Sequence, residues 1–115
     1  MHIITIDLVY FNYIKKRKKT IEGRINIGKY TTFKKNDLLK IVNGDKYIFV
    51  KITKLKKYSS FEEYLSLEGL KRTLPNIKTI KEGVNIYYSF PNYKENEKKY
   101  GVLAIYMKKL FDCDN

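Results

Sequence analysis

The sequence predicts an α+β fold: a small β-barrel of about five strands with two or three helices packed around it. Five segments carry strand-like patterns and three carry helical spacing or capping signals, in the order β, α, β, β, β, α, α, β. Isolated pairs of strands are only marginally stable, so closing the strands into a barrel is the simplest way to bury them. A chain of this length forms one domain, residues 1–115.

The N-terminal segment predicts a strand followed by a short helix. Residues 2–6 are rich in β-branched side chains and indicate a buried strand. Asp7 can cap the helix that follows. Three apolar residues then recur at helical spacing: Leu8, Phe11 and Ile14. The helix ends in the cationic run of residues 15–19, a favourable place for positive charge.

The clearest strand pattern covers residues 20–27. Alternate residues of a strand point to opposite faces, so this strand has one apolar face and one polar face. The apolar face consists of Ile21, Gly23, Ile25 and Ile27, and the polar face of Thr20, Glu22, Arg24 and Asn26. Glu22 and Arg24 then lie side by side, roughly 6.6 Å apart along the strand. Next to the cationic run, this pair suits a site for a polar, anionic ligand.

The middle of the chain predicts a β-hairpin. Residues 28–32 indicate a loop or a short helical turn, and residues 37–42 and 47–55 read as strands. Between the two strands, Asn43-Gly44 is a type I′ turn signal.

Two capping boxes predict helices in the second half of the chain. They pair Ser60 with Glu63 and Thr79 with Glu82. Residues 93–99 are polar and are expected to be exposed. Residues 100–107 predict the last strand, which is apolar on both faces and is therefore expected at the centre of the sheet.

The formal net charge is +12, from 24 Lys and Arg against 12 Asp and Glu. An excess of this size favours a polyanionic partner. A second explanation is compositional, because the abundance of Lys, Ile, Asn and Tyr is typical of an AT-rich genome. Net charge alone does not separate RNA, DNA and a membrane surface.

The sole cysteine, Cys113, and the sole histidine, His2, limit the possible chemistry. No intramolecular disulfide is possible, which fits a reducing, intracellular compartment. Metal sites of the His/Cys type are excluded, and we expect no metal or cofactor. There is no membrane-length apolar run and no secretory signal, so no membrane partner is expected. The run of residues 15–19 fits a nuclear localisation signal, but we favour the cytoplasm.

Lys19, Glu22 and Arg24 also carry a resemblance to a known family. Residues 19–24 resemble the G-x-K-x-x-E-x-R signature of the ASCH family, which has a PUA-like fold. The glycine of the signature falls on Arg17, a departure that affects the turn before the strand. Asn36-Asp37 and the closing segment 99–105 are similar to the family as well, so the resemblance covers nearly the whole chain.

Together, the resemblance and the strand alternation predict an RNA- or nucleotide-binding domain with a basic cleft. Lys19, Glu22 and Arg24 would line the cleft, with Lys18 and Lys57 at a rim that faces phosphate. Lys and Arg suit phosphate, and an Arg–Glu pair can grip the edge of a splayed base. The expected partner is single-stranded RNA or a modified nucleotide derived from it. Four tyrosines are candidates for stacking on a base: Tyr10, Tyr30, Tyr87 and Tyr88.

Catalysis is the alternative that the resemblance implies. One ASCH branch hydrolyses N4-acetylcytidine with a lysine, a threonine and a glutamate. Lys19 matches the lysine, but Glu22 occupies the threonine position, so Thr20 and Glu82 are the weaker candidates for the other two roles. A ribonuclease that uses Lys19 is a second enzymatic option. If the domain is an enzyme, Lys19 and Glu22 are its catalytic candidates.

Two further explanations need no nucleotide. Glu22 and Arg24 can form a salt bridge on a barrel wall, and many such pairs contribute little to stability. A protein-interaction module is the other, and it would expose an apolar patch.

Overall fold

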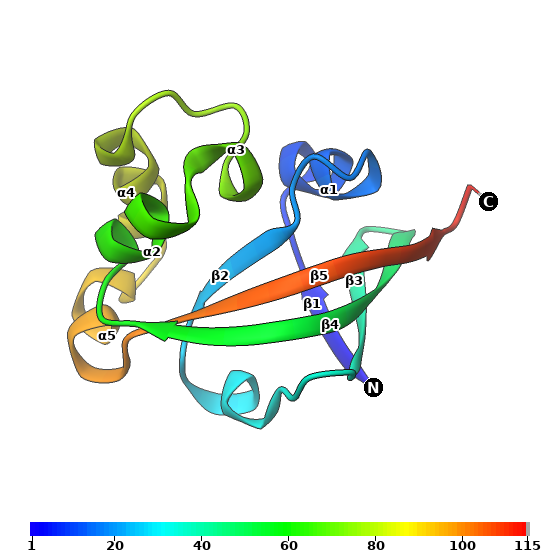
Figure 1. The fold of residues 1–115 in the computed structure, drawn as a ribbon, viewed down its shortest axis with the longest axis horizontal. Helices are drawn as coiled ribbons and strands as arrows, with labels where there is room; N and C mark the ends of the chain where they lie inside the picture. Colours follow the sequence, from blue (N-terminus) through cyan, green and yellow to red (C-terminus); the bar gives the residue numbers. More distant parts are fainter. Residues whose placement is uncertain (115) are drawn as a thin grey trace.

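In the computed structural model, which describes residues 1–114, five strands form one curved mixed sheet with the order β1-β3-β4-β5-β2 (Figure 1). The strands are β1 (His2–Thr5), β2 (Ile21–Ile25), β3 (Leu38–Asn43), β4 (Lys46–Tyr58) and β5 (Val102–Asp112). The helices are α1 (Leu8–Lys15), the 3₁₀ helix η1 (Gly28–Thr32), α2 (Phe61–Glu68), α3 (Leu70–Thr73), α4 (Ile80–Tyr88) and α5 (Tyr93–Tyr100).

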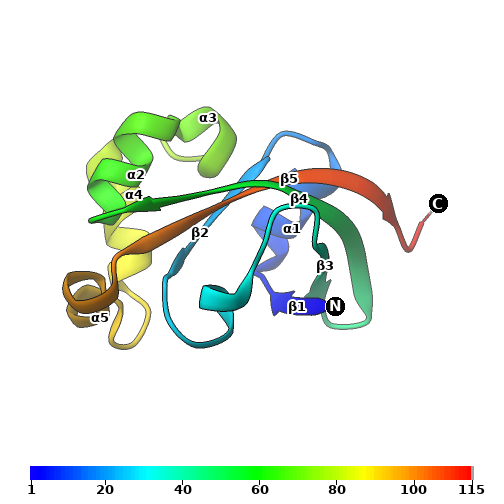
Figure 2. The same ribbon diagram turned by 60° about the horizontal axis from the view of Figure 1, so that its bottom comes forward.

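The sheet is a half-barrel whose two edge strands are β1 and β2. β1 pairs in parallel with β3, and the other neighbouring strands pair antiparallel. The long strands β4 and β5 form the curved middle of the sheet (Figure 2). Register shifts at Phe49/Val50 and Ile52/Lys54 mark the irregularities expected where a strand bends strongly. The predicted α+β barrel of about five strands is therefore confirmed, and its opening lies between β1 and β2.

Two apolar cores lie on opposite faces of this sheet. In the first core, Phe11 and Ile14 of α1 pack against the inward side chains of β1, β3, β4 and β5. In the second core, α2 and α4 pack against β2 and β5, and the ring of Phe61 stacks on Tyr87 with centroids 4.1 Å apart. Residues 102–105 of β5 contribute to both cores, which confirms the central position predicted for the last strand.

Local sequence signals place most of the element boundaries correctly. The side chains of Ser60 and Thr79 accept hydrogen bonds from the backbone N–H groups of Glu63 and Glu82, at 3.0 and 3.2 Å. The turn between β3 and β4 contains Gly44 at φ 61°. Asp7 is the N-cap residue of α1, but its side chain makes no capping hydrogen bond.

The segment 93–99 differs most from its prediction, because it forms most of α5. Its buried residue Glu97 accepts hydrogen bonds from the backbone N–H of Phe61 and the hydroxyl of Tyr88, both at 2.7 Å. α5 and the short α3 add two helices to the three that the sequence indicates. β4 and β5 are also longer than predicted, ending at Tyr58 and Asp112.

The turn from α1 into β2 is a Schellman motif with an unusual residue. The N–H of Lys18 donates to the carbonyl of Tyr13 at 2.9 Å, and that of Arg17 donates to the carbonyl of Ile14 at 3.0 Å. Arg17 occupies the left-handed position, with φ 62°, where glycine is most common. The backbone thus keeps a glycine-type turn without the glycine.

Candidate functional site

A cavity of about 220 Å³ opens between β1, β2 and the α4–α5 region. Lys19, Glu22 and Arg24 all line it. The other lining residues are Thr5, Ile6, Asp7, Tyr10, Gly23, Leu74, Ile86, Tyr87, Phe90 and Tyr93. The three charged residues predicted from the sequence therefore meet on one concave surface, together with four aromatic side chains.

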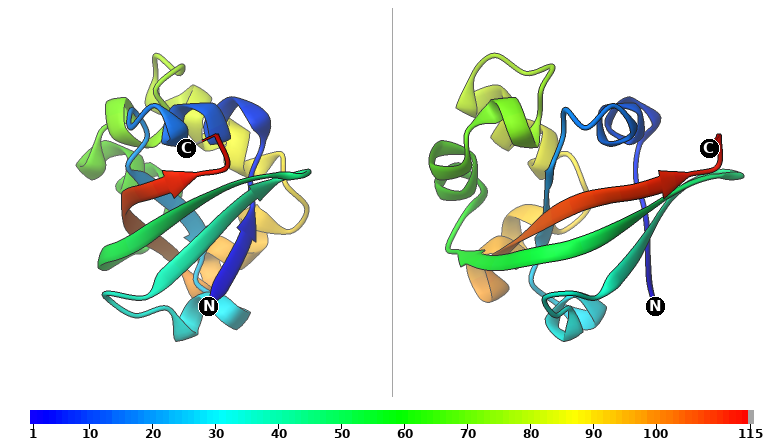
Figure 3. Two further views of the ribbon diagram at one scale, coloured as in Figure 1. Left: turned by 90° about the vertical axis from the view of Figure 1, so that its right-hand side faces the viewer. Right: turned by 45° about the vertical axis from the view of Figure 1, so that its right-hand side comes forward.

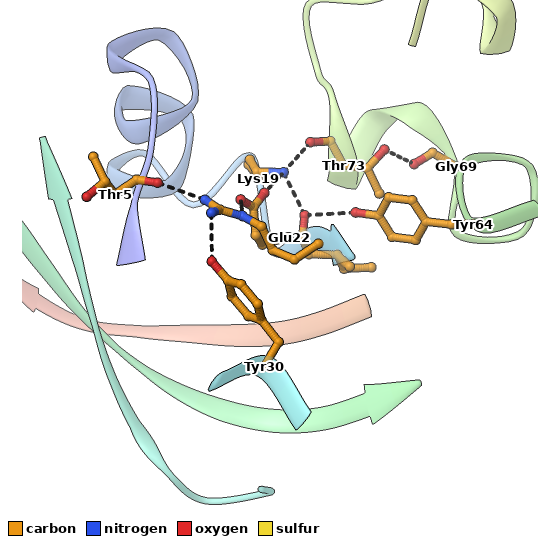
Figure 4. Close-up of polar contacts among 9 residues, drawn as sticks. Thr5, Lys19, Glu22, Tyr30, Tyr64, Gly69 and Thr73 are labelled. Carbon is orange, nitrogen blue, oxygen red and sulfur yellow. Dashed lines mark hydrogen bonds and ion pairs between the residues drawn. The ribbon is translucent and has the colours of Figure 1, made fainter. Parts of the chain in front are cut away.

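Lys19 is almost fully buried, with 2% of its surface exposed, and it is held by three acceptors (Figure 4). Its Nζ donates to the carbonyls of Ile21 at 2.8 Å and Thr73 at 2.5 Å, and lies 3.1 Å from Oε1 of Glu22. An ammonium group has three N–H donors, so these contacts use all of them. Burial lowers the pKa of Lys19, and the neighbouring Glu22 opposes that shift.

Glu22 and Arg24 form a charged pair at the wall of the cavity. Nε of Arg24 donates to Oε2 of Glu22 at 2.7 Å. Burial alone would raise the pKa of Glu22, but Lys19 and Arg24 outweigh it and the net shift is downward. Burial alone would lower the pKa of Arg24, but Glu22 holds it above the ordinary value. The site therefore presents an ionised carboxylate beside an ionised guanidinium at neutral pH.

Arg24 also bridges the two edge strands of the half-barrel. One terminal nitrogen donates to the carbonyl of Thr5 in β1 at 2.8 Å, and the other donates to the hydroxyl of Tyr30 at 2.9 Å (Figure 4). Lys29, in η1, donates to the carbonyl of Ile3 at 2.6 Å. No ladder pairing joins β1 and β2 in the described chain, so these side chains span the opening.

Gly23 lets β2 lie directly against α2. A Cβ atom at Gly23 would come within 2.5 Å of Cε2 of Tyr64, whose side chain is fully buried. The hydroxyl of Tyr64 reaches the carbonyl of Ile21 at 3.5 Å (Figure 4). This close approach fixes the position of β2, and with it the position of Glu22 and Arg24.

Four other predicted site residues lie outside this cavity. Lys18 and Lys57 are exposed, and neither lines it. Thr20 lines a second cavity of about 180 Å³, which Lys19 also lines, together with Arg17, Lys108 and Lys109. Glu82 is exposed at the start of α4, where it pairs with Thr79.

Of the four tyrosines predicted to stack on a base, two line the cavity and two do not. Tyr10 and Tyr87 line the cavity, whereas Tyr30 binds Arg24 and Tyr88 binds Glu97. The lining residues that were not predicted to belong to the site include Asp7, Phe90 and Tyr93. Phe90 and Tyr93 flank the Pro91-Asn92 turn between α4 and α5, and their rings are in contact. The sequence around Tyr93 is polar and has no regular apolar spacing, so it does not predict this aromatic pair.

Comparison with known proteins identifies the family. A family model described as the ASCH domain matches residues 4–111. The chain belongs to the ASCH domain family. None of the curated proteins compared with this ASCH domain matches it.

Two solved structures are similar to this ASCH domain over almost its whole length. The crystal structure of the hypothetical protein PH0355 is 38% identical, with a TM-score of 0.87, over 94% of this chain and 97% of that chain. The solution NMR structure of protein PF0455 from Pyrococcus furiosus is 37% identical, with a TM-score of 0.79, over 95% of this chain and 96% of that one.

Residues 1–114 of this ASCH domain lack the features of two other kinds of site. Helices of sufficient length and apolarity to cross a membrane are absent from that part of the chain. The same residues contain no group of three or more His, Cys, Asp or Glu side chains that could hold a metal ion.

Proposed function

We propose that this ASCH domain binds RNA by taking one nucleobase, or one modified nucleotide, into the cavity beside Glu22 and Arg24. The observation that carries the proposal is an ionised carboxylate–guanidinium pair inside a small cavity with aromatic lining. A nucleobase has polar edges and flat apolar faces, and single-stranded RNA is read through both.

The charged pair supplies both kinds of hydrogen-bonding group. Glu22 accepts one hydrogen bond from Arg24 and one from Lys19, which leaves further acceptor capacity on its two oxygens. Arg24 uses three of its five N–H groups in the contacts described above. A base with an amino or imino N–H next to a carbonyl oxygen complements this arrangement.

The size and lining of the cavity favour a single base. Its volume, about 220 Å³, is below the roughly 300–1,000 Å³ of pockets for drug-sized ligands. Tyr10, Phe90 and Tyr93 offer rings at its wall. Stacking on such rings is worth about 1–3 kcal/mol per base.

Charge also sets the orientation of the ligand. Glu22 and Asp7 both line the cavity, so a phosphate group is disfavoured beside them. We therefore place the base inside and the phosphate at the exposed, lysine-rich surface. Lys19 uses its donors internally, so its role in this proposal is to position Glu22 rather than to contact phosphate.

Binding of nucleosides, nucleoside monophosphates and short single-stranded RNA, measured by titration calorimetry and NMR, tests the proposal. We expect at least one base to bind and to shift resonances of cavity residues. Phe90 is 39% exposed, so Phe90→Ala should fold and lose roughly tenfold in affinity.

Glu22→Gln tests the polar contact between the carboxylate and the base. Glu95→Gln is its control, since Glu95 is exposed and outside the cavity. Glu22→Gln should weaken binding, and Glu95→Gln should leave it unchanged. Thermal unfolding of each variant checks the fold. Equal binding by both variants, or no binding of any base, overturns the proposal.

Catalysis receives less support from the geometry than binding does. In the amidohydrolase alternative, Thr20 and Glu82 would act beside Lys19. Thr20 and Lys19 both line the second cavity, but Glu82 lies exposed at the start of α4, where it pairs with Thr79 and lines neither cavity. Incubation with N4-acetylcytidine and with RNA tests both enzymatic options. Product formation that Lys19→Met abolishes in a folded protein would replace binding by catalysis as the assignment.

A further inference from the structure

One face of the sheet, outside both cores, combines aromatic rings with lysines. We call it the lysine–aromatic face and define it by six residues: Lys40, Tyr47, Phe49, Lys51, Lys108 and Phe111. The strand register assembles it in rows. Lys40, Phe49 and Phe111 lie opposite one another across β3, β4 and β5. Lys51 and Lys108 form the adjacent row.

This face points away from the first core. Along β4, Ile48, Val50 and Ile52 are buried in that core, while the residues between them point to the other side. Phe111 is 47% exposed. Helices α2–α5 gather at the other end of the sheet (Figure 1). Strands β1, β3, β4 and β5 run side by side at the lysine–aromatic end (Figure 3).

The rings form a continuous cluster. Phe49 stacks on Phe111 with centroids 4.9 Å apart, and Tyr47 meets Phe49 edge-on at 5.6 Å. Nζ of Lys40 lies 5.1 Å from the ring centre of Tyr47 and 5.9 Å from that of Phe49. The stacked pair Phe49–Phe111 thus has Lys40 on one side and the row of Lys51 and Lys108 on another.

The charge on this face has one sign. None of its six positions is acidic, and Lys51 lies directly opposite Lys108. Like charges directly opposite each other in a sheet destabilise it. An anion laid across them would remove this repulsion.

We propose that the lysine–aromatic face binds single-stranded nucleic acid, with bases stacked on Phe49 and Phe111 and phosphates near Lys40, Lys51 and Lys108. Sheet surfaces with exposed rings and surrounding cations bind single strands in this way, with little sequence preference. The proposal goes beyond the cavity, which takes one base, because the face would hold a run of several nucleotides.

Two other occupants fit the face less well. A second copy of the chain, placed by a two-fold axis, would bring one positively charged face against another. A duplex would satisfy the lysines, but its bases are already stacked inside the helix and offer nothing to the rings. The test below detects either occupant, and finding either one would contradict the proposal.

The test measures binding of a fluorescent single-stranded RNA of roughly twelve nucleotides and of its duplex, as a function of salt. The double variant Lys51→Gln/Lys108→Gln should weaken single-strand binding and reduce its salt dependence. The matched control, Lys78→Gln/Lys81→Gln, removes the same charge from exposed positions outside this face and should have a smaller effect. Phe111→Ala should lower affinity roughly tenfold.

The lysine variants relieve a repulsion, so they are expected to fold even if Phe111→Ala does not. Nucleoside binding in the cavity should be unchanged by all face variants, which separates this proposal from the proposed function. Three results overturn it: duplex RNA binds as tightly as the single strand; the face and control variants behave alike; or sedimentation shows a dimer that Phe111→Ala dissociates.

Discussion

The Nζ atom of Lys19 lies 3.1 Å from Oε1 of Glu22, and both side chains are buried next to the cavity. Neither charge is stable there alone, because moving an ion out of water costs several kcal/mol. Arg24 completes the group from the other side of the carboxylate. The stability of the domain and the shape of its candidate site therefore depend on the same three side chains.

Lys19→Met should destabilise the domain by about 3–5 kcal/mol, because it leaves a buried carboxylate with one partner fewer. It also removes the donor for the carbonyls of Ile21 and Thr73. Urea unfolding measures the loss. The control is Lys18→Met at an exposed position, which should change the free energy of unfolding by less than about 0.5 kcal/mol. Similar losses in the two variants would contradict this account.

Glu22 should make the domain less stable in acid. Lys19 and Arg24 outweigh burial and hold the folded pKa of Glu22 below its ordinary value. The unfolded chain then binds this proton at a higher pH than the folded chain does. The stabilisation is complete above the ordinary glutamate pKa and is lost as the pH falls through the folded pKa.

Urea unfolding of wild type and Glu22→Gln at several values below about pH 5 checks this sign. The difference between the two proteins should shrink as the pH falls. Comparing them removes the contributions of other acids with lowered pKa values, such as Asp37 and Glu68. A difference that is constant with pH would show that the Glu22 carboxylate titrates alike in both states.

Arg17→Gly should stabilise the domain. Arg17 holds φ 62°, which costs a residue with a Cβ roughly 1–2 kcal/mol. Glycine avoids that cost but loses more backbone entropy on folding than arginine does. We therefore expect a net gain of about 0.5–1 kcal/mol in the free energy of unfolding. Arg17→Ala is the control, since it removes the charge and keeps the strain. Equal stability of the two variants would mean that charge, not backbone, decides at this position.

Glu97→Ala should destabilise the domain by about 2–3 kcal/mol. Glu97 accepts from the backbone N–H of Phe61, at the first residue of α2, and from the hydroxyl of Tyr88. Removing it leaves a buried N–H at a helix start without its acceptor. Thermal unfolding should show a clear loss for Glu97→Ala and almost none for Glu95→Ala, whose side chain is exposed.

Local patterns predicted most of the fold and the charged part of the site. Strict alternation placed Glu22 and Arg24 on one face of β2, and the family resemblance added Lys19. The capping boxes at Ser60 and Thr79 located α2 and α4 because their hydrogen bonds join residues only three apart. These features depend on neighbours in the sequence.

Other features depend on distant partners and could not be predicted. Glu97 looks like a surface residue because its acceptor role exists only once α2 packs beside α5. Tyr93 lies in the same polar segment and lines the cavity only because of that packing. The opening between β1 and β2 is likewise a property of the whole sheet, since strand patterns do not specify which edges stay unpaired.

The hydrogen bond from Arg24 to the carbonyl of Thr5 links the cavity to β1, so a ligand in the cavity would affect that strand. A base that binds the two free N–H groups of Arg24 and draws the guanidinium towards itself weakens the hydrogen bond to the carbonyl of Thr5. The contact between β1 and β2 would then weaken, while the side chains that line the cavity become more ordered around the bound base. Amide protons of β1 should exchange faster on binding, even though the protein as a whole becomes harder to unfold.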